Sequence, residues 1–131
     1  MKKEFLMSSN RSGHFSADLI TAGGRQAFHV ATGVHYFVRE GVHCIEASND
    51  QGEAFLVYLP AEIETGIFQL QLGLPSVIHV TGSTEAELYP LGTLELTVGG
   101  DAQFDGRFTG TDANGIVVEN GSFRLEHEAV T

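Results

Sequence analysis

Short runs of β-branched, aromatic and leucine residues recur along this chain, and Gly, Asn or Asp punctuates them. Runs of this length suit strands, and no window carries a sustained helical period. The candidate strands are 14–20, 26–31, 33–39, 42–48, 53–59, 66–72, 76–81, 92–98, 103–110, 116–119 and 122–126. The sequence therefore predicts an all-β chain of about eight to ten strands with little or no helix, either an antiparallel barrel (calycin-like barrels included) or a two-sheet sandwich.

The segment VHCIEASNDQGEAFLVYL, residues 42–59, predicts a hairpin. A three-residue loop at 50–52, with Gly52 in the left-handed region, pairs Asn49 with Glu53. Continuing this register pairs Ala47 with Phe55, Ile45 with Val57 and His43 with Leu59. A loop longer by one residue would exchange the two faces of the strand, so the three-residue loop is preferred.

The segment GRFTGTDANGIVVENGSFRLE, residues 106–126, contains Asn-Gly twice. The first repeats the form of the 50–52 loop, which pairs Asp112 with Ile116 and Gly110 with Val118. A bulge at the second, 120–121, then returns Phe123 and Leu125 to the face of Phe104. The alternative makes 120–121 a second hairpin turn. We favour a turn followed by a bulge.

Segments 33–39 and 53–59 are apolar on both faces, whereas segments 66–72 and 92–98 alternate between apolar and polar. Something must cover the second apolar face. The candidates are another layer of strands, the N-terminal segment or a second copy of the chain. A homodimer is the expected partner arrangement.

The chain has 131 residues, which is one domain by size, 1–131, with residues 1–13 expected to be flexible or loosely packed. Its net charge of -10 disfavours binding to nucleic acid or to anionic membranes. No apolar run reaches the about 20 residues of a membrane helix. The single cysteine and the short apolar start predict a cytoplasmic protein; a secreted or periplasmic one would need a leader that has been removed.

The order of HFSADLI, VHCIEASNDQGEAFLVYLP with TGIFQL, GTLELTV, QFDGRFTGTDANG and IVVENGSFRLE resembles a family of small bacterial all-β domains of unknown function. The resemblance covers residues 14–126. Members often occur on secreted proteins or lipoproteins, which the resemblance implies for this chain as well, although it has no leader or lipidation cysteine near its start. The family supplies no catalytic residues to carry over.

Few residues suggest chemistry. Metal candidates on neighbouring predicted strands are His29, His35, His43 and Glu46, but the histidines lack close spacing, so scattered surface histidines are the favoured interpretation. Cys44 and His43 should point to opposite faces, which predicts a buried structural cysteine. Asp112 and Asn114 suit turn chemistry better than a calcium loop. We interpret Glu85 and Glu87 as part of a solvated loop. The segment PAEIET, 60–65, is the one candidate for a helical turn.

No catalytic constellation is present, so neither enzymatic activity nor a cofactor is expected. The favoured hypothesis is a non-enzymatic binding or interaction module, forming a homodimer. A second is a calycin-like carrier of a small apolar ligand, which aromatic residues would line: Phe37, Phe55, Phe68, Phe108 and Tyr58. A core filled by phenylalanines would argue against it. A third is a metal-dependent enzyme that uses the strand histidines.

Overall fold

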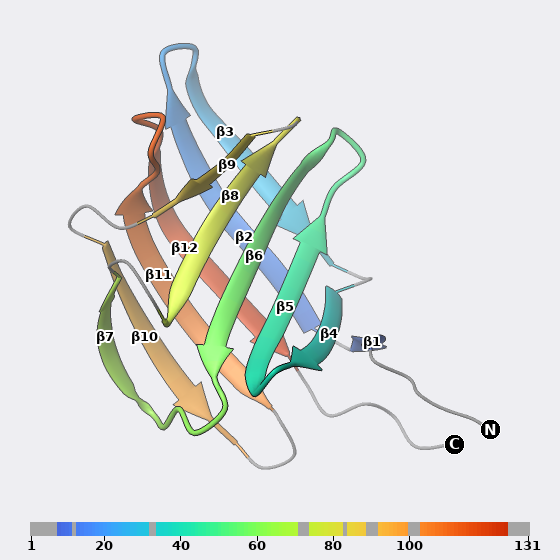
Figure 1. Cartoon of the computed structure of the whole chain (residues 1–131). Coiled ribbons are helices and arrows are strands. Elements are labelled where there is room, and N and C mark those ends of the chain that lie inside the picture. Colours follow the sequence, from blue (N-terminus) through green and yellow to red (C-terminus); the bar gives the residue numbers. More distant parts are fainter. Residues whose placement is uncertain are drawn as a thin grey trace.

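The computed structural model describes residues 8–11, 13–31, 34–70, 74–82, 84–88, 92–99 and 103–125. These residues form two antiparallel sheets of six strands each, and the sheets stack face to face with crossing strand directions (Figure 1). The fold is therefore the two-sheet sandwich, not the barrel, of the two predicted architectures.

Sheet A has the order β1 (Ser8–Arg11), β4 (Val34–Arg39), β5 (Val42–Ser48), β6 (Glu53–Pro60), β8 (Ser76–Thr81) and β9 (Thr84–Glu87). Sheet B has the order β3 (Gly24–Val30), β2 (Gly13–Thr21), β12 (Val117–Leu125), β11 (Phe104–Thr111), β10 (Gly92–Val98) and β7 (Gly66–Leu70). The chain passes repeatedly from one sheet to the other, so both sheets contain strands from early and late parts of the sequence.

Two strands were not expected. Residues 8–11 form β1, which pairs with β4, so the prediction that residues 1–13 are flexible or loosely packed is wrong for these four residues. Residues 1–7 and 12 lie outside the described residues. Residues 84–87 form β9 instead of a solvated loop. Segment 60–65 is not helical: it holds a single turn in which Ile63 N donates to Pro60 O at 3.1 Å. The ends of predicted strands at residues 33, 71–72 and 126 also lie outside the described residues.

The two hairpin loops share a pair of hydrogen bonds from the loop backbone to the side chain that begins the loop. Asn49 Oδ1 accepts from Gln51 N at 2.9 Å and from Glu53 N at 3.0 Å. Asp112 Oδ1 accepts from the N atoms of the equivalent residues, Asn114 and Ile116, each at 2.9 Å. The loop glycines have positive φ, 81° at position 52 and 87° at position 115, which a residue with a Cβ adopts at a cost.

The predicted register of both hairpins is confirmed. Ala47 pairs with Phe55 and Ile45 with Val57. Gly110 pairs with Val118, and the register then shifts so that Phe104 pairs with Leu125. The shift lies at 119–121, where Asn120 has a φ of 55°. The second Asn-Gly is thus a bulge within β12, and the alternative of a second hairpin turn is wrong.

Phenylalanine rings fill the centre of the sandwich. The ring of Phe15 on β2 lies 5.3–6.1 Å, between centroids, from the rings of Phe28, Phe55, Phe108 and Phe123. Phe55 comes from sheet A and the other four from sheet B, and all five are at most 2% exposed. Aromatic contacts at the centre therefore help to join the sheets, and they contribute beyond the area that they bury.

Candidate functional site

The outer faces of the two sheets differ in chemistry. On sheet A, alternate residues of the central strands point away from the core and are mainly apolar. We define the apolar face as the following residues: Phe37, Val42, Cys44, Leu56, Tyr58, Ile78 and Val80. Cys44 is buried and the others are half-buried. An apolar patch on the solvent-facing side of a sheet is typical of a site that binds another molecule.

Charged side chains border the apolar face at two opposite edges. Beside β5, the strand β4 presents His35 and Arg39, and the Arg39 guanidinium lies 5.2 Å from the centroid of the Phe37 ring. At the other edge, β9 presents Glu85 and Glu87. One side of the face therefore carries the Arg39 guanidinium and the other carries two carboxylates, while the Glu46 carboxylate lies within the face, opposite Leu56.

Cys44 and Tyr58 lie opposite each other in the middle of the apolar face. Burial raises the pKa of the Cys44 thiol, and Arg39 acts in the opposite direction. Burial also raises the pKa of the Tyr58 hydroxyl, and the nearby Cys44 and Glu46 raise it further. Both groups are therefore held in their neutral forms, which suits an apolar surface rather than a reactive thiolate.

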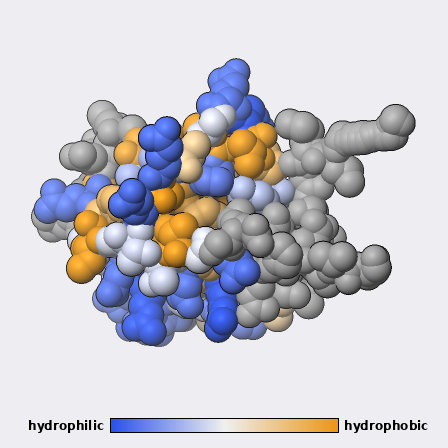
Figure 2. Space-filling model, turned by 90° about the horizontal axis from the view of Figure 1, so that it is seen from below, coloured by the Kyte–Doolittle hydropathy of each residue, from blue (hydrophilic) through white to orange (hydrophobic). Residues whose placement is uncertain are grey.

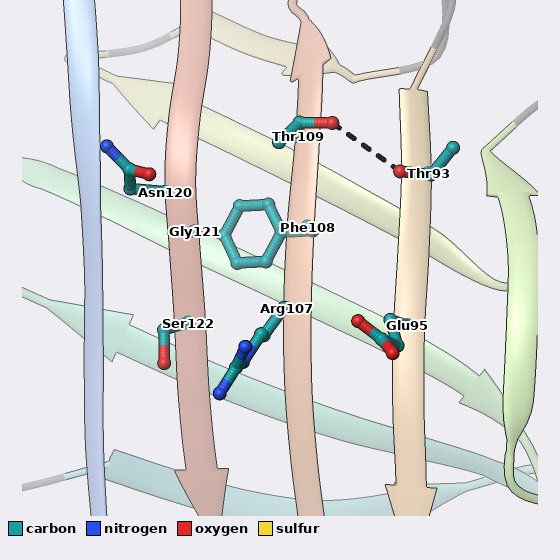
Figure 3. Close-up of a pocket in the computed structure, with 8 residues that line it drawn as sticks. All are labelled: Thr93, Glu95, Arg107, Phe108, Thr109, Asn120, Gly121 and Ser122. Atoms are coloured by element: carbon teal, nitrogen blue, oxygen red, sulfur yellow. Dashed lines mark hydrogen bonds between the residues drawn. The ribbon is translucent and has the colours of Figure 1, made fainter.

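The outer face of sheet B is mainly polar, although Ile67 is exposed on it. A depression of about 480 Å³ lies on this face. Figure 3 shows its lining residues: Thr93, Glu95, Arg107, Phe108, Thr109, Asn120, Gly121 and Ser122. The depression is open to solvent, and the Thr93 and Thr109 hydroxyls lie 3.5 Å apart across it. Hydroxyl, carboxylate and guanidinium groups alternate over the strands, as on a hydrated sheet face.

One contact in this region resembles a nucleophile and its base. Ser122 Oγ lies 3.4 Å from His14 Nε2. A working pair is closer, at about 2.6–3.2 Å, and a third group orients the base. Among the described residues no carboxylate is hydrogen-bonded to the other ring nitrogen of His14. We therefore assign this contact to the packing of neighbouring strands.

A histidine lies at the lower end of the sandwich, where β5 begins and β6 ends. His43 Nε2 donates to Ala61 O at 3.3 Å, and the Tyr36 hydroxyl lies 2.7 Å from His43 Nδ1. Its ring also contacts Phe104 of sheet B, with 5.1 Å between centroids. Seen from this end, apolar surface lies between polar side chains (Figure 2), and Val38 is 40% exposed. Because both ring nitrogens are engaged, His43 has no free lone pair for a metal ion.

A second histidine is paired inside the sandwich. His79 Nδ1 on β8 donates to Asp112 Oδ2, 3.0 Å away, at the end of β11, and both side chains are at most 1% exposed. The His79 ring stacks on Phe55 with 4.8 Å between centroids. Within the described part of the chain, His79 Nε2 has no hydrogen-bond partner. The pair joins β8 of sheet A to the loop that follows β11 of sheet B, and the predictions from the sequence do not include it.

The structure separates the four metal candidates. His29 is exposed on the outer face of sheet B. His35 and Glu46 lie opposite each other on the outer face of sheet A, and His43 points into the lower end of the sandwich. Among the described residues, no three His, Cys, Asp or Glu side chains are grouped so as to hold a metal ion.

The five residues proposed to line a ligand cavity also fall into separate places. Phe55 and Phe108 belong to the packed aromatic core, and Phe68 packs against its edge. Phe37 and Tyr58 lie on the apolar face, on the opposite side of sheet A. The prediction that Cys44 is buried and points away from His43 is confirmed.

Comparison of the chain with protein-family models, with curated proteins and with solved structures gives no match. The resemblance to small bacterial all-β domains therefore stays a prediction. No helix in the described residues has the length and apolar character needed to cross a membrane.

Proposed function

We propose that this protein is a non-enzymatic interaction module that forms a homodimer through the apolar face of sheet A. The observation that carries the proposal is the unequal character of the two outer faces. Leu56, Tyr58 and Ile78 lie side by side on neighbouring strands of one face, while the matching positions of sheet B carry Thr, Glu, Arg and Ser. Association would remove this apolar surface from water.

The interior of the sandwich supports an interaction surface over a carrier. The residues that an enclosed apolar ligand would need to contact, such as Phe55 and Phe108, pack against each other with 5.8 Å between ring centroids. Binding at the outer face requires no internal space. The separation of His29, His35 and His43 likewise favours a module without a catalytic metal. Because Cys44 is an unpaired thiol, we place the module in a reducing compartment, the cytoplasm.

The test is a matched pair of lysine substitutions. Leu56 on the apolar face lies opposite Glu46, and Ile67 on the outer face of sheet B lies opposite Glu95, so a lysine at either position gains the same kind of neighbour. We expect the wild-type protein to sediment as a dimer, Leu56→Lys as a monomer and Ile67→Lys as a dimer. A wild-type protein that stays monomeric over a concentration series would overturn the proposal, as would equal effects of the two variants.

A further inference from the structure

We infer that Asn114 is a site of spontaneous chemical modification, at which the side-chain amide is lost and the main chain is rearranged to isoaspartate, whereas Asn120 is protected. Both asparagines are followed by glycine, so the two sites differ in their surroundings and not in the residue that follows. The inference goes beyond the proposed function and does not depend on dimer formation, because it concerns one chain and one of its hairpin loops.

The reaction uses the peptide nitrogen that follows the asparagine. After this nitrogen loses its proton to solvent, it attacks the side-chain carbonyl carbon, Cγ; the new C–N bond closes a five-membered imide, and ammonia leaves. Water then opens the imide at either carbonyl, which gives aspartate or isoaspartate. In isoaspartate the main chain runs through Cβ and Cγ. Glycine favours the attack because it has no Cβ to hinder its nitrogen and because its backbone adopts many conformations.

Asn114 lies in an exposed loop. Residues 113–115 between β11 and β12 are all exposed, and this loop projects from one end of the sandwich (Figure 1). Among the described residues, the side-chain amide of Asn114 has no hydrogen-bond partner. Gly115 N donates to Asp112 O at 2.9 Å, so the reaction requires this turn hydrogen bond to open. Opening of an exposed loop costs far less free energy than opening of a strand inside a sheet.

Asn120 has the same following residue but lies inside sheet B. It belongs to β12, which runs between β2 and β11 (Figure 3). Its amide is held, since Nδ2 donates to Asp18 Oδ2 at 3.0 Å, and Gly121 is buried against the Phe108 ring. Attack on Asn120 Cγ therefore requires β12 to separate from its neighbours, which protects this site.

Modification at Asn114 would change the loop that holds His79. Asp112 Oδ1 accepts from the N atoms of residues 114 and 116, and Asp112 Oδ2 accepts from His79 Nδ1 in the core. Isoaspartate adds a carbon to the main chain between these two N–H groups, and it adds a carboxylate two residues from that of Asp112. We expect both changes to weaken the loop hydrogen bonds and, with them, the orientation of Asp112 toward His79.

The first measurement compares the two asparagines in the folded and in the unfolded chain. The protein is incubated in mildly alkaline buffer, with and without guanidinium chloride, and is then digested at acidic pH by a protease that cleaves after glutamate. Cleavage after Glu119 places the two asparagines in different peptides, in which mass spectrometry measures the conversion and fragmentation distinguishes isoaspartate from aspartate. In guanidinium chloride, Asn114 and Asn120 should convert at similar rates. In the folded protein, Asn114 should convert at least about tenfold faster, since an exposed loop opens more readily than a strand inside a sheet.

The second measurement tests the effect on the fold. The wild type, Asn114→Gln and Asn120→Gln are each aged and unfolded in urea, and each is compared with its own fresh sample. Glutamine reacts slowly, because its longer side chain would close a six-membered ring. We expect ageing to lower the urea midpoint of the wild type and of Asn120→Gln, and to leave that of Asn114→Gln unchanged. Fresh Asn114→Asp carries the added charge without the longer main chain, so its midpoint should lie above that of the aged wild type.

The outcomes separate the parts of the inference. Equal conversion of Asn114 and Asn120 in the folded protein would overturn the protection of Asn120, and a folded protein without conversion at Asn114 would overturn the modification site itself. Equal losses of midpoint in the aged wild type and in aged Asn114→Gln would overturn the effect on the fold. Faster conversion of Asn114, with a midpoint loss that Asn114→Gln prevents, supports the inference in full.

Discussion

The ring of Phe108 on β11 lies directly over Gly121 on β12, its cross-strand partner. A Cβ atom at position 121 would lie 2.5 Å from the Phe108 ring. The reverse arrangement occurs two pairs further along, where Phe123 covers Gly106 and a Cβ atom there would lie 2.4 Å from the ring. Neither glycine has a positive φ, so each is needed for the space that it leaves.

We expect Gly121→Ala and Gly106→Ala each to lower the free energy of unfolding by about 1–3 kcal/mol, because the rings must move in a filled core. Gly66→Ala is the matched control: Gly66 also lies in a strand without a positive φ, but a Cβ atom there meets Phe68 only at 3.6 Å. Its expected effect is within about 0.5 kcal/mol. Urea unfolding measures all three, and equal losses at the three positions would contradict this account.

The equivalence of the two hairpin loops gives a second prediction. Asn49→Ala and Asp112→Ala remove the same two loop hydrogen bonds, and Asn49→Ala removes in addition the bond from Asn49 Nδ2 to Glu53 Oε1. Only Asp112→Ala leaves His79 without a partner in the core. We expect Asp112→Ala to be more destabilising by about 1–3 kcal/mol, the cost of a buried polar group without a partner. Asp112→Asn, which keeps the loop acceptor, should fall between the wild type and Asp112→Ala. An Asn49→Ala variant as unstable as Asp112→Ala would show that the His79 link contributes nothing.

The pKa of Cys44 predicts how stability changes at high pH. Burial raises the pKa of this thiol above its ordinary value of 9.0, so the folded state retains the proton more strongly than the unfolded chain. The stabilisation is complete below the ordinary pKa and is lost as the pH rises through the raised one. We expect the free energy of unfolding to decrease above about pH 9, and to decrease less steeply in Cys44→Ala.

Tyr58 provides the control for that experiment, since burial raises the pKa of its hydroxyl as well. Tyr58→Phe should also reduce the loss of unfolding free energy at alkaline pH, but over a higher pH range than Cys44→Ala does. Urea unfolding in a series of alkaline buffers measures both slopes. An unchanged slope in Cys44→Ala would mean that the folded state does not perturb the thiol.

A surface cluster gives a fourth prediction, of a small effect. Arg25 on β3 lies 2.9 Å from Asp18 and 3.2 Å from Glu119, but its side chain is 54% exposed. Solvent screens ion pairs of this kind, so Arg25→Ala should lower the free energy of unfolding by less than about 1 kcal/mol. Thermal unfolding in low and high salt tests this. A loss above about 2 kcal/mol would assign the cluster a structural role that its exposure does not suggest.

The sequence predicts those parts of the fold that neighbouring residues determine. The pairing of Ala47 with Phe55 follows from one loop length, and the bulge at 120–121 follows from the need to return Phe123 to the core. Strand β9 was not predicted, because Ala86 is the one apolar residue of TEAE that points into the core. A single apolar residue gives no pattern of alternating apolar and polar positions. Strand β1, with the sequence SSNR, pairs through its backbone and carries no apolar signal.

The candidate site was only partly visible in the sequence. The apolar character of 33–39 and 53–59 on both faces indicated an outer surface, and Ile78 and Val80 extend it across β8. In contrast, the partners His79 and Asp112 are 33 residues apart, one on a strand of sheet A and the other in the loop after a strand of sheet B, so no local pattern connects them. The one available signal was the likeness of the 112–116 loop to the 49–53 loop. It implies that one carboxylate oxygen of Asp112 accepts the loop hydrogen bonds, so that the other oxygen remains available for a second partner.

The unlike outer faces of the two sheets also limit how far assembly can proceed. A pair that joins through the apolar faces turns both outer faces of sheet B outward, and a third copy then meets mainly hydroxyl and charged groups. Under the proposed function, growth through these faces would therefore stop at two subunits, without a ring or a filament. Such a dimer would expose the outer face of sheet B on two opposite sides. A group attached to that face would therefore be displayed twice, in opposite directions.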